Sequence, residues 1–352
     1  MKKIFVLPLI LLFAAVLSAS EYKFTALGDT HYDGAQYHTS PPAKSYQKRE
    51  RQRNYSMWSD GRSDAVLAAA AKKTTPEMRF VVQLGDITQG DCDTSELFEK
   101  MFADAFAKIK SHFPDNKLLI VKGNHDVRQL NVEGKSNGPA AKALLPLIAK
   151  ELGVEKVTGT YSVRQGKDLY IFFDAFLPKK QSLQSLKKVL ADNPDTRYTF
   201  FITHLPVLNC CTGNPAWLVK DYKSVRDLLL ERNAIIIAAH THIPSLIQAK
   251  RNGKQLTQVV VTSVGKDWIP GSKPEINISG FDKYCQKVGL KRIASKRFKP
   301  SFDDMKSFEL PVFEILKHKT CVGFAKLKIS DAGVDIEYYT NAGKPAMVKK
   351  LR

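Results

Sequence analysis

The sequence lacks the patterns that mark several common classes of protein. It contains no internal repeat, no low-complexity linker and no Cys-x-x-Cys pair, which excludes a repeat protein and a zinc ribbon. Beyond the N-terminus, no apolar run reaches the roughly 20 residues that a membrane-spanning helix needs. The 43% hydrophobic and 25% charged residues instead indicate a globular protein with a sizeable core.

The longest apolar run lies at the N-terminus and is too short to span a bilayer. Two lysines precede a 14-residue apolar stretch (4–17), and three small residues (18–20) follow it. A basic segment, a short apolar segment and a small-residue cleavage site form a secretory signal. We therefore expect residues 1–20 to be a signal peptide that is cleaved after Ser20, with Ala19 as the alternative. The mature protein would then be exported, and so periplasmic or secreted.

Cysteine is scarce, with five residues in the chain. In an oxidising compartment some of them would pair, and an odd number leaves at least one over. Cys210 and Cys211 are adjacent, and a bridge between neighbours requires strained geometry, so each would pair elsewhere or remain free. Cys92, Cys285 and Cys321 are the possible partners, and buried unpaired cysteines are the alternative.

Negative charge is in deficit, with 54 Lys and Arg against 35 Asp and Glu and a formal net charge of +19. Such a charge attracts anionic substrates, nucleic acid or acidic surfaces. The basic residues are scattered, however, and are denser only at 48–53 and 291–299. Neither stretch carries a nucleic-acid-binding motif, so we predict no specific nucleic-acid partner and assign most of the charge to solvated surface.

Apolar runs alternate with helix-like stretches along most of the chain. The strand candidates are Tyr22–Leu27, Phe80–Leu84, Leu118–Val121, Leu169–Phe173, Tyr198–Thr203, Ile235–Ala239 and Gln258–Thr262. The helix candidates are Asp64–Lys73, Ser95–Ser111, Ala140–Leu152 and Asp221–Asn233. This alternation predicts an α/β sandwich whose sheets are covered by helices.

Two segments interrupt the alternation. Residues 32–60 are too long for a plain loop, and their tyrosines and Trp58 predict an ordered flap beside a functional site. Residues 266–310 carry Trp268 and several prolines and are expected to form an irregular insertion. After them, closing strands are expected within 311–340, at Phe313–Leu316, Val322–Ile329 and Val334–Tyr339. We expect one domain over residues 21–352, with its core motifs at 22–264.

Five polar motifs each come directly after an apolar run. They are Asp29-Thr30-His31, Gly85-Asp86, Gly123-Asn124-His125-Asp126, His204 and His240-Thr241-His242, and they contain five of the eight histidines. Sites in open α/β sheets form outside the carboxyl ends of the strands, where every one of these motifs would lie. Glycines 28, 85 and 123 allow the chain to leave each strand sharply.

The side chains of these motifs suit metal ions. Asp29 and His31 are two residues apart, as are His240 and His242, so each pair can project to one side of an extended segment. Imidazole and carboxylate favour zinc, iron and manganese over calcium. Seven ligands are too many for one ion but fit two ions that share a carboxylate. Such a pair lowers the pKa of a bridging water and clamps the oxygens of a phosphoryl displacement.

On these motifs the chain resembles the calcineurin-like metallophosphoesterase superfamily, as an exported bacterial-type member, over residues 22–264. The resemblance implies a four-layered α/β sandwich of two mixed sheets flanked by helices, with two divalent or trivalent ions (Mn, Fe or Zn). It implies one metal at Asp29, His31, Asp86 and His242 and the other at Asp86, Asn124, His204 and His240, with Asp86 bridging. His125, which is not a ligand in the family, would protonate the leaving oxygen or stabilise the transition state.

The chain departs from the family pattern at several positions. Thr203 and Ala239 stand where glycine often precedes the histidine. Gln89 replaces the last carboxylate of Gly-Asp-x-x-Asp, which orients the catalytic histidine. Either Asp91 or another carboxylate takes over, or His125 is less strongly polarised. The arginines that grip substrate phosphate in protein phosphatases have no recognisable equivalents.

The sequence therefore predicts an exported phosphoesterase, a hydrolase in which a hydroxide bridging two metal ions attacks the ester. Its substrate would be a small or polymeric phosphomonoester or phosphodiester, selected by the loops at 32–60 and 266–310. The alternative is a non-catalytic metal-containing protein that binds anionic polymers or membrane surfaces through its basic charge.

Overall fold

The computed structural model describes residues 21–42, 44–76, 78–128, 130, 138–210, 217–265, 276–316, 322–340 and 343–352. The predicted signal peptide, Trp268, Cys211 and Cys321 lie outside these residues. In the part of the chain that is described, no helix is both long enough and apolar enough to cross a membrane.

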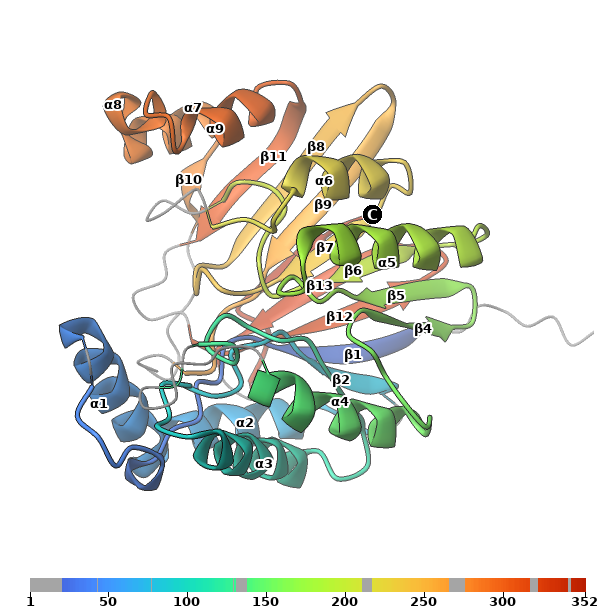
Figure 1. Cartoon of the computed structure of the whole chain (residues 1–352). Coiled ribbons are helices and arrows are strands. Elements are labelled where there is room, and N and C mark those ends of the chain that lie inside the picture. Colours follow the sequence, from blue (N-terminus) through green and yellow to red (C-terminus); the bar gives the residue numbers. More distant parts are fainter. Residues whose placement is uncertain are drawn as a thin grey trace, which may run out of the picture.

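The described strands form two mixed sheets that pack face to face (Figure 1). The first has the order β14-β13-β12-β1-β2-β3, with bounds Tyr22–Leu27 (β1), Phe80–Gln83 (β2), Lys117–Ile120 (β3), Phe324–Ser330 (β12), Gly333–Tyr339 (β13) and Met347–Lys350 (β14). The second has the order β10-β11-β8-β9-β7-β6-β5-β4, with bounds Tyr161–Gln165 (β4), Asp168–Phe172 (β5), Thr199–Ile202 (β6), Ile235–Ala238 (β7), Ser245–Arg251 (β8), Lys254–Val260 (β9), Ile276–Ser279 (β10) and Glu309–Leu316 (β11). Strands β1, β2 and β3 are parallel, as are β5, β6, β7 and β9, and the other pairs are antiparallel.

Helices cover the outer face of each sheet. The first sheet carries α2 (Arg62–Lys73), α3 (Ser95–His112) and α4 (Gly138–Leu152), and the second carries α5 (Lys179–Asp192), α6 (Tyr222–Leu230), α7 (Phe281–Val288), α8 (Leu290–Ile293) and α9 (Lys299–Met305) (Figure 1). The 3-10 helix η1 (Ala35–Tyr37) and helix α1 (Ser45–Ser59) lie in the segment predicted to be a flap. One apolar core therefore fills the space between the sheets and one lies under each helical layer. The predicted four-layered α/β sandwich is confirmed.

Strand β1 illustrates how the alternation of side chains builds these layers. Phe24 and Ala26 belong to the core between the sheets, whereas Leu27 belongs to the core under the helices. Successive side chains of a strand point to opposite faces, so a strand buried on both faces is apolar throughout. This is why the motif strands appear in the sequence as continuous apolar runs.

Helix α3 forms where the sequence predicts a helix and buries one apolar face. The Thr94 hydroxyl accepts a hydrogen bond from the backbone N–H of Leu97 at 3.4 Å and caps the first turn. The buried face consists of Phe98, Met101, Phe102, Ala105 and Ile109. These positions recur every three or four residues, which places them on the side that faces the sheet.

The prediction of an irregular insertion at 266–310 is wrong for the described part of that segment. Residues 276–310 contain β10 and the short helices α7, α8 and α9. None of these helices exceeds eight residues; Gly280 and Gly289 cap α7, and Pro300 lies in the first turn of α9. The recurrence of apolar residues every three or four positions, which indicates a helix, can be recognised only over about 11 or more residues. Strands β4, β8 and β14 and helix α5 are also absent from the sequence prediction.

Two cysteines that were candidates for disulfide pairing are free thiols in the structure. Cys92 is fully buried, with its sulfur 3.8 Å from that of Met101, and burial raises the pKa of its thiol. Cys285 lies on α7 and is partly buried. Both side chains therefore pack as small apolar groups.

Candidate metal centre

The carboxyl ends of five parallel strands, three in one sheet and two in the other, meet at one place. Strands β1, β2 and β3 end before the first three motifs, and β6 and β7 end before the last two. A parallel bridge between Gly28 and Ser263 brings the two sheets together there. The structure places all seven predicted ligands at this junction: Asp29, His31, Asp86, Asn124, His204, His240 and His242.

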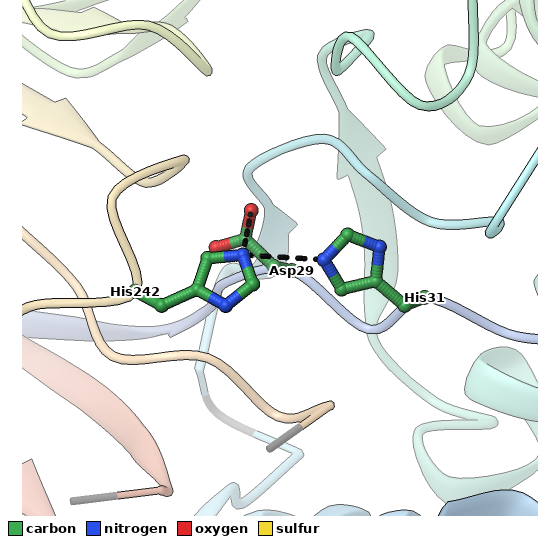
Figure 2. A group of neighbouring side chains, drawn as sticks. All are labelled: Asp29, His31 and His242. Carbon is green, nitrogen blue, oxygen red and sulfur yellow. Dashed lines mark hydrogen bonds and ion pairs between the residues drawn. The ribbon is translucent and has the colours of Figure 1, made fainter. Parts of the chain in front are cut away.

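The first group of ligand atoms contains Asp29, His31 and His242 (Figure 2). The Nε2 atoms of the two imidazoles are 3.2 Å apart, and Nε2 of His242 is 3.5 Å from a carboxylate oxygen of Asp29. Asp29 and His31 are almost completely buried, and the two rings and the carboxylate converge on one point (Figure 2). Two imidazole nitrogens and a carboxylate at such distances suit a transition-metal ion.

The second group contains Asp86, His204 and His240. Nε2 of His204 lies 3.3 Å from Oδ2 of Asp86, 3.2 Å from Nδ1 of His240 and 3.0 Å from Oδ1 of Asn124. The other nitrogen of His204, Nδ1, lies 2.8 Å from the carbonyl oxygen of Leu84. A hydrogen on Nδ1 can donate to this carbonyl, which leaves the lone pair of Nε2 directed at the group.

Asp86 links these two groups, and its carboxylate also lies in a third cluster of candidate ligand atoms, with His31 and His125. Its Oδ2 lies 3.9 Å from Nε2 of His31, which belongs to the first group, and 3.3 Å from Nε2 of His204 in the second. Burial would lower the pKa of His204, but the carboxylates of Asp86 and Asp29 raise it to about 9. Because Oδ2 of Asp86 faces a ligand nitrogen of each group, the side chains fit two ions, with Asp86 at the position that a bridging ligand would take.

The backbone at four of these residues is left-handed, contrary to the predicted extended segments. His31, Asp86, His240 and His242 have φ angles of 45°, 50°, 68° and 54°. This region is costly for residues other than glycine and recurs at functional sites. As a result His240 and His242 join different groups, although they are two residues apart, whereas Asp29 and His31 stay together.

Asp126 has a structural role that the sequence motif did not reveal. Its carboxylate accepts hydrogen bonds from the backbone N–H groups of Thr88 at 3.0 Å, Gly123 at 2.9 Å and Ile87 at 3.3 Å. Burial and the nearby charge of Asp86 raise the pKa of Asp126 to about 6. The side chain thereby ties the loop after β2 to the loop after β3.

The expectation that Asp91 or another carboxylate supports His125 is wrong, and the neutral group found there fits the alternative of a less strongly polarised imidazole. Its Nδ1 lies 2.9 Å from the backbone carbonyl oxygen of Gln89, so a main-chain group takes the place of a carboxylate. Asp91 instead binds the side chains of Gln89, at 3.1 Å, and Arg128, at 2.9 Å. The imidazole is therefore oriented by the position of the backbone, which explains why glutamine is tolerated at residue 89.

An open cleft of about 730 Å³ leads to these groups. Helix α1 forms part of its wall, and the indole N–H of Trp58 anchors this segment by lying 3.2 Å from the carbonyl oxygens of Thr30 and His31. The lining also includes Arg53 and Arg128, so cationic side chains are present although the sequence offered no recognisable phosphate-binding arginine. Apolar side chains line it as well, among them Phe176, Leu205 and Trp217.

The fold and the site define an α/β sandwich with buried histidine and aspartate groups suited to metal ions. The family model of calcineurin-like phosphoesterases matches residues 22–244. The chain therefore belongs to the calcineurin-like metallophosphoesterase family.

Solved structures share the fold at low sequence identity. The chain aligns over 94% of its length with 72% of the PhoD structure, at 10% identity and a TM-score of 0.53. Over 94% of its length the chain also aligns with 53% of purple acid phosphatase PPD1 from yellow lupin (Lupinus luteus) seeds, at 12% identity and a TM-score of 0.50. The chain thus spans about half of the lupin protein. A search of curated protein sequences finds no significant match.

Metal removal is expected to destabilise the folded chain. An ion that binds only the native state adds RT ln(1 + [L]/Kd), or about 2.7 kcal/mol at a concentration of 100 Kd, to the free energy of unfolding. Unfolding of protein treated with a chelator, and then supplied with Mn²⁺ or Zn²⁺, measures this difference. The variant His204→Ala should lose much of the gain. Identical unfolding curves with and without metal would contradict the proposed centre.

Proposed function

We propose that the protein is an exported, metal-dependent phosphoesterase that hydrolyses phosphomonoesters or phosphodiesters. The observation that supports this most strongly is the pair of His/Asp groups that Asp86 joins beside an open cleft. Two bound ions would supply a hydroxide at neutral pH and stabilise charge on the phosphate oxygens. Asp29, His31, Asp86 and His242 would hold one ion, and Asp86, Asn124, His204 and His240 the other.

His125 would act on the ester without binding metal. Its Nε2 lies 3.9 Å from Oδ2 of Asp86, and its backbone N–H donates to the other oxygen of Asp86 at 2.7 Å. The carbonyl of Gln89 holds the ring so that Nε2 faces the cleft. A side chain in this place can stabilise or protonate the leaving oxygen.

The purified protein, analysed for metal, should be screened with Mn²⁺, Fe²⁺ or Zn²⁺ against phosphomonoesters and phosphodiesters. Hydrolysis of either class would support the proposal. Inactivity with every metal and ester would overturn it and favour the non-catalytic binding protein.

Replacing His125 by alanine should lower kcat by about 10²- to 10⁴-fold, the usual contribution of a general acid or base. The metal content should stay unchanged, because the side chain is not a proposed ligand. His112→Ala is a matched control, since His112 lies on α3 and contacts Asp64 at 2.8 Å. Loss of metal in His125→Ala would contradict the assigned role.

Export is proposed from residues 1–20 alone. Sequencing the N-terminus of the exported chain tests it, and the expected first residue is Glu21.

A further inference from the structure

Arg128 brings a positive charge to the metal-facing end of the cleft. It follows His125 by three residues, and its backbone N–H donates to the His125 carbonyl oxygen at 3.3 Å. Its guanidinium Nη2 lies 2.7 Å from Nε2 of His125, the nitrogen that faces the predicted centre. The side chain is 19% exposed and lines the cleft. A phosphate group beside His125 would therefore come within reach of this guanidinium.

Two carboxylates hold Arg128 in this orientation. Its Nη1 donates to Glu50 at 2.7 Å and to the buried Asp91 at 2.9 Å. Asp91 is itself fixed, because the side-chain amides of Gln47 and Gln89 donate to it at 2.9 Å and 3.1 Å. The guanidinium is therefore oriented before any ligand arrives, which reduces the entropy lost on binding. The Nη1 atom of the guanidinium is bound to these two carboxylates, and its Nη2 atom faces the cleft beside His125.

The contact between Arg128 and His125 is one that a phosphate can replace. Nδ1 of His125 faces the Gln89 carbonyl and can donate to it, so Nε2 can accept from Arg128 as a neutral imidazole nitrogen. A charged phosphate oxygen forms a stronger hydrogen bond with guanidinium than a neutral acceptor does. When phosphate binds Nη2, Nε2 of His125 is released from its contact with Arg128.

We propose that Arg128 is a phosphate-binding residue of this cleft and that it favours esters with a terminal, doubly charged phosphate group. A phosphomonoester has three non-bridging oxygens, so one can bind Arg128 while others face the metal ligands. A phosphodiester has only two non-bridging oxygens, because its second ester substituent occupies the third. The inference rests on the proposed function and narrows its substrate class to phosphomonoesters.

The first test measures binding and not turnover. Inorganic phosphate is titrated calorimetrically into the metal-loaded wild type, Arg128→Gln and Arg128→Lys. The Kd should rise about 10- to 100-fold in Arg128→Gln, as expected for loss of a charged hydrogen bond. Arg128→Lys should recover part of the affinity, because it keeps the charge but loses the planar fork. Unchanged phosphate affinity in Arg128→Gln overturns the inference.

The second test compares 4-nitrophenyl phosphate with bis(4-nitrophenyl) phosphate. In Arg128→Gln, kcat/KM should fall about 30-fold for the monoester and less than about 3-fold for the diester. Equal losses would mean that Arg128 only positions His125, and would overturn the inference. Arg62→Gln is the matched control, because Arg62 pairs with Asp60 on the surface at 3.1 Å and does not line the cleft. Metal content and unfolding temperature must match the wild type.

The two tests separate this inference from the function on which it rests. A wild type that hydrolyses neither ester with any metal overturns the proposed function. A wild type that is active, with an Arg128→Gln variant that keeps its preference between the esters, overturns only the role of Arg128.

Discussion

Replacing Asp86 by asparagine is expected to remove most of the bound metal and nearly all of the hydrolysis. The substitution keeps the size of the side chain, and its amide oxygen can still accept from the backbone N–H of His125. It removes the charge of the carboxylate whose Oδ2 faces Nε2 of His31 in one group and Nε2 of His204 in the other. We expect fewer than one ion per chain and a fall in kcat/KM on the order of 10³-fold, equivalent to about 4 kcal/mol.

Metal analysis and steady-state kinetics measure the two effects in the same preparation. Asp104→Asn is the control, because Asp104 lies on α3 and pairs with Lys100 at 2.6 Å. That variant should keep its metal and its activity. If Asp86→Asn retained two ions per chain, Asp86 would not be the shared ligand.

Replacing Gly123 by alanine should disrupt the centre without touching a ligand. A Cβ atom at this position would lie 2.0 Å from the backbone nitrogen of Asp86 and 2.1 Å from its Oδ1. Neither atom belongs to a flexible chain end, since Asp126 ties the two loops together. We expect the free energy of unfolding to fall by about 1–3 kcal/mol, as for an overpacked core, and most metal to be lost.

Chemical denaturation and metal analysis test this expectation. Gly166→Ala is the matched control, because Gly166 has a φ of 58° and nothing within 4 Å of the position that a Cβ would take. It should lose about 1 kcal/mol from backbone strain alone and keep its metal. A Gly123→Ala protein with normal metal content would show that Asp86 can move without losing its ions.

The sequence was a good guide to the strands that carry the motifs. Parallel strands buried on both faces are short, continuous apolar runs, and this pattern can be read locally. The polar residues that follow β1, β2, β3, β6 and β7 could therefore be assigned to one end of the sheets. Short helices between glycines and prolines, such as α7 to α9, left no comparable pattern.

The details of the site could not be read in the same way. The spacing of His240 and His242 predicted that both side chains project to one side of an extended segment. Their backbone is left-handed instead, and the two side chains lie in different groups. Gln89 left open which group supports His125, and the structure shows that it is a backbone carbonyl oxygen, which every residue has. Side-chain identity carries no information about either feature.

What the sequence by itself determined is the family, the order of the strands that carry the motifs and the chemical type of each candidate ligand. These depend on residues that are neighbours in the chain. Only the tertiary structure decided which side chains share a group, and that Arg128 meets Glu50 from a helix 78 residues earlier. Such contacts depend on how α1 packs against the loop after β3, and no local pattern encodes that packing.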